Sequence, residues 1–322
     1  MKKIPIIIFI QLIIIGFIGF KIYLKAPLVL GKSTIIPLKK NQLEFTPSVF
    51  KFFYEPKPSQ HIEVQTLWTP FKARYVINVD SLHDRFNYQT EKPPKTYRIV
   101  TLGDSFTYGM FVYTEDNWTE KLEDTLNELK CNNIDNFEVI NLAVGGYDIE
   151  YAVERFKIRG KKYNPDLILW LLKDDDMNFI NELMMEDEEY YANELHRTNK
   201  YDELVNQGIN YPSWKYAYED MLKEIGSEAI RNRQKNAMAK LFSLYEGKLI
   251  FATFKNDRRE LENFLSEFSD NKNRIIFDGI RDIYKEETLF FGHDGHPSIQ
   301  GHAAIAEDMF NFLKQNNSFT CL

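Results

Sequence analysis

The pattern of apolar residues divides the chain into an N-terminal stretch and a long alternating region. Apolar residues run from Ile4 to Leu24, interrupted only by Gln11, Lys21 and small residues. A helix that crosses a bilayer needs about 20 apolar residues, and this stretch is long enough if the Lys21 side chain extends to the membrane surface. No A-x-A-like cleavage site follows it. We therefore predict a transmembrane anchor over residues 1–25, with a cleaved signal peptide as the alternative.

Lysine residues flank this stretch on both sides and give opposite indications of its orientation. Lys2 and Lys3 favour a cytoplasmic N-terminus under the positive-inside rule, whereas Lys21, Lys25 and Lys32 follow the helix. We expect a single-pass membrane protein whose large C-terminal part lies outside the cytoplasm, because a protein that stays in the cytoplasm has little other use for such a helix.

Residues 26–96 are punctuated by proline and rich in residues that favour strands. Residues 66–68 and 74–79 are typical of short strands, and residues 91–95 are typical of a linker. The sequence thus predicts a small β-rich extension and linker ahead of the main domain.

From residue 97 onward, short apolar runs alternate with amphipathic segments. The apolar runs predict strands over residues 98–102, 138–143, 166–172, 248–254 and 274–277. The amphipathic segments predict helices over residues 116–130, 150–159 and 301–314. This alternation predicts a parallel α/β sheet with right-handed crossovers, in one domain over residues 97–322.

Residues 178–240 interrupt the alternation. The segment is acidic at its start, helical in pattern and too long for a simple connection. Two interpretations are open: a helical cap inserted over the ligand-binding edge of the sheet, or an ordinary pair of crossover helices.

Composition narrows the class of protein only a little. Hydrophobic residues make up 44% and charged residues 27% of the chain, which is typical of a globular protein. The net charge of -7, without a basic block, gives no support for a nucleic-acid partner. Cys131 and Cys321 are the only cysteines, and no Cys/His spacing indicates a metal site. We expect two unrelated thiols, although a disulfide could form outside the cytoplasm.

Unusual polar residues follow the predicted strands. The segments are Gly103-Asp104-Ser105 after the first strand, Gly145-Gly146 after the second, Asp174-Asp175-Asp176 after the third, and His293-Asp294-Gly295-His296 before the last helix. Open parallel sheets bind ligands at the carboxyl ends of their strands. We therefore expect these segments to meet in one site.

The order of these segments resembles the SGNH/GDSL hydrolase family. The matching positions are Gly103-Asp104-Ser105 in the first block, with Phe106 in place of the usual Leu, Gly145 in the second, and Asp294, His296, Pro297 and Gly301-His302 in the last. The resemblance covers roughly residues 97–313. It implies a three-layer, flavodoxin-like parallel sheet, which is the SGNH hydrolase fold, and serine esterase activity.

The candidate nucleophile is Ser105, which lies between a strand and a helix, where backbone N–H groups favour negative charge. A structural helix N-cap is the alternative role. His296 is the candidate base, the alternative being a solvent histidine, and His302 is expected to be structural.

The expected orienting acid is Asp294. It lies two residues before His296, whereas the family usually has its acid three residues before the histidine. A Ser-His dyad with a backbone carbonyl in place of Asp294 is the alternative.

The resemblance also implies an oxyanion hole made of the backbone N–H groups of Ser105 and Gly145 and of an asparagine side chain in the third block. Asp175 takes the place of that asparagine. An ionised carboxylate cannot donate a hydrogen bond. Asp175 would therefore contribute only if protonated, which adjacent carboxylates favour.

Together these observations predict a membrane-anchored serine esterase that works without a metal ion or organic cofactor. Its substrates would be O-acyl or O-acetyl groups of envelope glycans, or lipid esters, and an acyltransferase would result if a sugar hydroxyl took the acyl group. One rival is a metal-dependent hydrolase with O/N ligands from Asp104, Asp174, Asp175, Asp176, His293, Asp294 and His296. The other rival is a non-catalytic glycan-binding or assembly protein on the same fold.

Overall fold

The computed structural model describes residues 35–37, 48–66, 69–129, 131, 133–255, 259–270 and 272–316. The anchor predicted over residues 1–25 lies outside these ranges. Within them, every helix is too short or too polar to cross a membrane.

Five parallel strands form the central sheet. They are β5 (Thr96–Leu102), β6 (Asn136–Asn141), β7 (Leu167–Leu171), β8 (Lys248–Phe254) and β9 (Arg274–Ile280). Their order in the sheet is β6-β5-β7-β8-β9, and each neighbouring pair is parallel. The predicted strands and the flavodoxin-like order are confirmed. From β5 the chain first adds β6 on one side of the sheet and then β7, β8 and β9 on the other. Ligands of such sheets bind at the carboxyl ends of the two strands where the chain changes sides, here β5 and β7.

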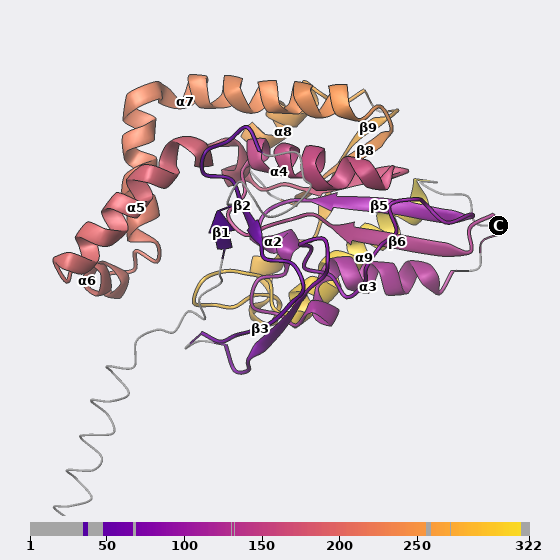
Figure 1. Ribbon diagram of the computed structural model, residues 1–322, viewed down its shortest axis with the longest axis horizontal. Helices are drawn as coiled ribbons and strands as arrows, with labels where there is room; N and C mark the ends of the chain where they lie inside the picture. Colours follow the sequence, from indigo (N-terminus) through magenta and orange to yellow (C-terminus); the bar gives the residue numbers. More distant parts are fainter. Residues whose placement is uncertain are drawn as a thin grey trace, which may run out of the picture.

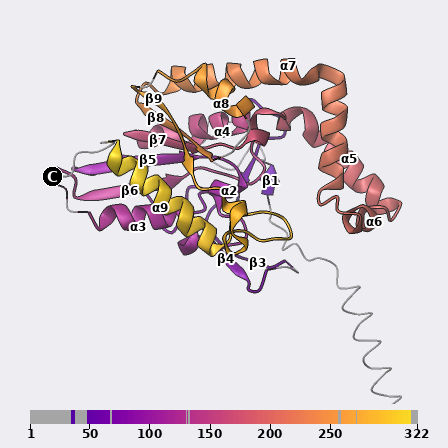
Figure 2. The same cartoon turned by 180° about the vertical axis from the view of Figure 1, so that it is seen from behind.

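Helices cover both faces of the sheet, giving three layers (Figures 1 and 2). One face carries α4 (Ile149–Arg155), α8 (Arg259–Ser266) and the C-terminal part of α7 (Pro212–Leu244). The other face carries α3 (Trp118–Asn127) and α9 (Ile299–Gln315). The helix expected over residues 150–159 continues after α4 as a π-helical turn, Phe156–Gly160.

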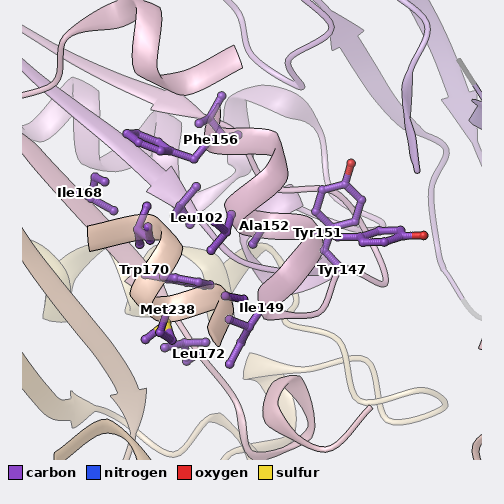
Figure 3. Packing of buried hydrophobic residues seen from close by; sticks show 14 of the residues in the cluster. Leu102, Tyr147, Ile149, Tyr151, Ala152, Phe156, Ile168, Trp170, Leu172 and Met238 are labelled. Atoms are coloured by element: carbon purple, nitrogen blue, oxygen red, sulfur yellow. The ribbon is translucent and has the colours of Figure 1, made fainter. Parts of the chain in front are cut away.

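Burial of the strand side chains on both faces explains why their sequences are apolar throughout. β7 is buried along its whole length, as expected for a central parallel strand. Figure 3 shows Ile168 and Trp170 of β7 in one cluster with Ala152 of α4 and Met238 of α7. These contacts hold the carboxyl ends of the strands, and the loops that follow them, in fixed positions.

Residues 178–240 divide into two parts, and the cap over the ligand-binding edge stays a prediction. α5 (Asn181–Arg197), α6 (Tyr201–Asn206) and the N-terminal part of α7 form an arm beyond the end of the sheet at which α2 lies (Figure 1). At Gly226 the backbone leaves the helical conformation, with φ 75° and ψ 159°, which glycine tolerates best. After this break, α7 packs on the sheet as an ordinary crossover helix.

The extension before β5 packs into the same body. It contains two antiparallel pairs, β1 (Ile35–Pro37) with β2 (Tyr54–Pro56), and β3 (Gln60–Val64) with β4 (Ala73–Ile77). The strand expected over residues 66–68 is wrong at its first position, because Thr66 instead forms a turn with Thr69 through reciprocal hydroxyl contacts; the other two positions lie outside the described residues.

A buried ion cluster joins this extension to the α/β domain. Glu55 of β2 accepts hydrogen bonds from both Arg155 and Arg159, and Arg159 also donates to Asp80 at 3.0 Å. Both arginine side chains are only 1% exposed. Because a buried charge without a partner is strongly destabilising, β2 is an integral part of the folded domain.

The expectation of two unrelated thiols is wrong for Cys131, which is disulfide-bonded. Cys321 lies outside the described residues.

Candidate active site

The turn after β5 presents Ser105 at the first position of the short helix α2 (Ser105–Tyr108). Asp104 is the N-cap residue, and its Oδ1 accepts the N–H of Phe106 at 2.9 Å. The alternative role of Ser105 as N-cap is therefore wrong. Gly103 has φ 151°, and a Cβ there would lie 2.4 Å from Thr107 Oγ1. Only glycine fits this position, so the turn that exposes Ser105 depends on it.

A second tight turn brings His296 to the same place. The N–H groups of Asp294 and Gly295 both donate to the carbonyl of Phe291, and the Phe291 N–H donates back to the carbonyl of His296 at 2.8 Å. Gly295 adopts φ 83°, in the left-handed region. The turn thus folds the loop before α9 back on itself and directs His296 away from it.

The three predicted catalytic side chains form one chain of hydrogen bonds. His296 Nε2 lies 2.8 Å from Ser105 Oγ, and His296 Nδ1 lies 3.1 Å from Asp294 Oδ2. Asp294 also accepts the backbone N–H of His296 through Oδ1 at 3.1 Å. An acid two residues before the histidine can therefore hold both the backbone and the ring of that histidine. The side chain of Asp294 is 2% exposed and that of His296 12%. This arrangement can take a proton from Ser105 and stabilise the resulting imidazolium.

Two other histidines near this turn are buried and have structural contacts. His302 Nδ1 accepts the N–H of Trp118 at 3.3 Å, and burial lowers the pKa of His302 to about 3. His83 contacts the carbonyl of Tyr108 at 2.6 Å, and burial lowers its pKa to about 4. Both therefore stay neutral near neutral pH.

The loop after β6 supplies the surface opposite His296. A Cβ built on Gly145 would lie 3.7 Å from Ser105 Cβ, so the Gly145 backbone borders Ser105 directly. The carbonyls of Gly145 and Gly146 are fixed by Tyr54 Oη at 2.8 Å and by Asn181 Nδ2 at 2.6 Å. Among the described residues, the N–H groups of Ser105 and Gly145 have no acceptor. They are available to bind a substrate oxygen.

Asp175 belongs to the loop that follows β7. It is exposed on the 3-10 turn Asp174–Met177, and within the described chain no hydrogen bond joins its side chain to Ser105, Gly145 or His296. Its neighbour Asp176 is buried and accepts the N–H of Lys173 at 2.8 Å. Any role of Asp175 in an oxyanion hole remains a prediction.

Aromatic and thioether side chains lie beside the hydrogen bonds that join Ser105, His296 and Asp294. The rings of Phe106 and Phe111 lie 5.3 and 5.2 Å from that of His296. Met110 Cε would lie 3.5 Å from a Cβ on Gly145. Phe111 adopts φ 66°, with its N–H donating to Tyr75 Oη at 2.7 Å. These residues were not recognisable in the sequence, because their place beside His296 depends on the turn that ends α2.

Lys173 is a further site residue that no motif indicated. Its Nζ lies 2.8 Å from Asp104 Oδ2 and 4.3 Å from the centre of the Phe106 ring. A lysine next to three aspartates in the sequence is usually a solvated residue, so only the folded chain shows that it reaches the nucleophile turn.

The residues suggested as metal ligands do not gather around a common point. Asp104 pairs with Lys173 and caps α2, Asp294 pairs with His296, and Asp175 is exposed. In the part of the chain that the structure describes, no group of three or more His, Cys, Asp or Glu side chains could hold a metal ion.

Comparison with known proteins gives a family match over most of the domain. The model described as GDSL-like Lipase/Acylhydrolase matches residues 99–309. Similar solved structures include the psychrotrophic esterase EstA from Pseudoalteromonas sp., with 16% identity over 69% of this chain and 99% of that chain and a TM-score of 0.44. A two-domain esterase active on acetylated mannans has 14% identity over 70% of this chain and 51% of that chain, with a TM-score of 0.41. A catalytic mutant of an acetylxylan esterase from Geobacillus stearothermophilus has 15% identity over 70% of this chain and 96% of that chain, with a TM-score of 0.41. No curated protein sequence matches the chain.

Proposed function

The chain belongs to the GDSL-like lipase and acylhydrolase family, and on this premise we propose that it cleaves carboxylic esters through an acyl intermediate on Ser105. Family membership makes the protein an ester hydrolase, so the alternative of a non-catalytic binding protein is wrong. The observation that carries the proposed mechanism is the hydrogen-bond chain from Ser105 Oγ through His296 to Asp294.

In this mechanism, Ser105 Oγ attacks the ester carbonyl while His296 Nε2 accepts its proton. Asp294 holds Nδ1–H and stabilises the imidazolium. The N–H groups of Ser105 and Gly145 donate to the oxyanion. The intermediate collapses as His296 returns the proton to the leaving alcohol, and the acyl group stays on Ser105. Water, or a sugar hydroxyl in a transferase, then takes the acyl group by the same steps in reverse.

The surroundings of Ser105 support a short acyl group. Met110 Cε lies 3.5 Å from a Cβ built on Gly145, and the centre of the Phe111 ring lies 5.2 Å from that of His296. We place the acyl chain on the side of Ser105 that these two side chains border. Phe111 is 4% exposed, and a buried ring on that side leaves more room for a short acyl group than for a long one.

Exposed tyrosines support a sugar as the alcohol part of the substrate. Tyr284 is 56% exposed and lies 3.5 Å from a Cβ built on Gly295. Tyr211 is 52% exposed, and its neighbour Asn210 donates to the carbonyl of His293 at 3.3 Å. Large aromatic rings that stay in water beside a catalytic turn suit stacking against sugar rings. O-acyl groups on envelope glycans are therefore favoured over lipid esters.

The apolar N-terminal stretch supports attachment to a membrane. We propose that residues 1–25 anchor the enzyme as a single span with the catalytic domain outside the cytoplasm. Full-length protein should then sediment with membranes and resist a salt wash, and deletion of residues 1–25 should release it. Release by salt alone would contradict the anchor, and protection of the domain from external protease would contradict the orientation.

The catalytic assignment is tested by labelling with a serine-directed phosphonate. Wild type should be labelled at Ser105 and hydrolyse p-nitrophenyl acetate with or without a chelator. Ser105→Ala should lose both labelling and turnover and still unfold at the wild-type temperature, whereas Ser243→Ala, which removes an exposed hydroxyl that donates to Lys240 O, should retain both. Turnover in a folded Ser105→Ala variant would refute the assignment.

The substrate class is tested by comparing esters. An acetylated oligosaccharide should be cleaved better than a phospholipid, and Tyr284→Ala should raise KM for the sugar ester without changing p-nitrophenyl acetate hydrolysis. Preference for the lipid would overturn the glycan proposal and leave the serine esterase intact.

A further inference from the structure

The nucleophile has a carboxylate as its immediate neighbour. Asp104 Oδ2 lies 3.5 Å from Ser105 Oγ. The negative charge that develops when Ser105 attacks an ester appears on the substrate oxygen beside that hydroxyl. An unpaired carboxylate so near the reacting hydroxyl would repel that charge, because like charges interact strongly where little water is present.

Lys173 lies where it can remove this repulsion. Its ammonium group is 2.8 Å from the same Oδ2 atom, and the two side chains are only 20% and 8% exposed. The other carboxylates facing the ammonium group come from its own segment, the buried Asp176 and the exposed Asp175. These charges outweigh the effect of burial and raise the pKa of Lys173 above its usual value, so the ammonium group stays charged.

The Asp104 carboxylate cannot simply turn away. Its Oδ1 atom caps α2 by accepting the N–H of Phe106 at 2.9 Å, and the Phe106 ring packs under Lys173 at 4.3 Å. The cap that positions Ser105 therefore holds a negative charge beside it, and the position of that charge is fixed.

We propose that Lys173 is a positioning residue for the esterase reaction: it neutralises the Asp104 carboxylate, so that the group that caps the nucleophile helix does not oppose the oxyanion. The inference rests on the proposed role of Ser105. It gives the segment that follows β7 a function through the cation of Lys173.

The test is a double-mutant cycle between Lys173 and Asp104, assayed with p-nitrophenyl acetate at mildly alkaline pH. Lys173→Met should lower kcat by about 10- to 100-fold with little change in KM, because the penalty belongs to the transition state. In the Asp104→Asn background the same substitution should cost less than about 3-fold, because the introduced amide is neutral and its oxygen can still cap α2. Lys173→Arg, which keeps the charge, should retain more activity than Lys173→Met.

A matched ion pair at the opposite end of the strands provides the control. Lys92 Nζ lies 2.6 Å from Asp166, with side chains 22% and 32% exposed, and Lys92→Met should leave kcat unchanged. Thermal unfolding of every variant separates lost activity from lost fold. An unchanged kcat in Lys173→Met, a loss confined to KM, or an equal loss in the Asp104→Asn background would each overturn the inference. If wild type itself is not labelled at Ser105, the proposed function fails instead.

Discussion

Replacing Gly145 with alanine is the sharpest test of the oxyanion site, because the change affects the reaction and not the fold. The Gly145 backbone does not adopt a positive φ. The new Cβ would lie 3.5 Å from Met110 Cε and 3.7 Å from Ser105 Cβ, and both are ordinary van der Waals distances. A Gly→Ala change at a compatible position typically stabilises a protein by about 0.4–1 kcal/mol. We therefore expect Gly145→Ala to unfold at or slightly above the wild-type temperature.

The same methyl group stands between Met110 and Ser105, where an ester carbonyl must enter to reach the two N–H groups of the oxyanion site. Loss of one oxyanion donor typically lowers kcat by about 10²–10³-fold, or about 2.7–4 kcal/mol in the barrier. We expect a loss of at least about 10²-fold in kcat/KM, since the methyl group keeps the carbonyl away from Gly145 N–H.

The assay combines p-nitrophenyl acetate hydrolysis, the rate of phosphonate labelling and thermal unfolding. Gly292→Ala is the matched control, since a Cβ there meets no atom within 4 Å and its φ is not positive; it should behave as wild type. A folded Gly145→Ala protein that keeps more than about a third of wild-type turnover would refute the placement of the substrate oxygen at Gly145.

Three further predictions follow from the site and its supports. His296→Ala should lose turnover as fully as Ser105→Ala, and the double variant should be barely worse than either single variant; additive rate losses would contradict a single catalytic unit. His302→Ala should instead mainly lower the unfolding temperature. Asp175→Asn should raise kcat near neutral pH if this side chain reaches the oxyanion in the substrate complex, and an unchanged pH–rate profile would show that backbone N–H groups suffice. Burial raises the pKa of Glu123 to about 8, so the folded protein holds a proton that the unfolded chain releases above its ordinary pKa of 4.5. Stability should thus fall as pH rises from about 4.5 to 8, and Glu123→Gln should be more stable than wild type above that range in chemical denaturation; a parallel pH dependence of both proteins would contradict this.

The fold could be predicted because its sheet is buried on both faces. β7 is a continuous apolar run, and β8 is apolar apart from Lys248 and Thr253, so the hydrophobic pattern locates both strands. The alternation with helices gives the parallel topology. The break in α7 could not be predicted, because Gly226 interrupts a helical pattern that continues on both sides. Which half of that helix joins the domain depends on tertiary packing.

The approach of Ser105 to His296 was predictable only through motif order, since 191 residues separate them. The contact between Lys173 and Asp104 was beyond prediction for a physical reason. Both follow neighbouring strands, but whether a long side chain crosses from one strand end to the next depends on rotamers that no sequence pattern encodes. The contact of His83 with the Tyr108 carbonyl of α2 could not be predicted either, because His83 comes from a distant loop.

Glu55 limits how far the protein can be truncated from its N-terminus. A fragment that starts at the first strand of the sheet, near residue 97, would match the region that the family shares, yet it would leave the guanidinium groups of Arg155 and Arg159 in the interior without their carboxylate. Removing one partner of a buried ion pair typically costs about 3–5 kcal/mol, a large part of the stability of an average domain. The same cut would remove Tyr54, whose hydroxyl holds the Gly145 carbonyl. The smallest autonomous enzyme is therefore larger than the family's common region. An expression boundary chosen from family alignment alone should give an unstable and inactive protein, and one placed before β1, ahead of residue 35, should not.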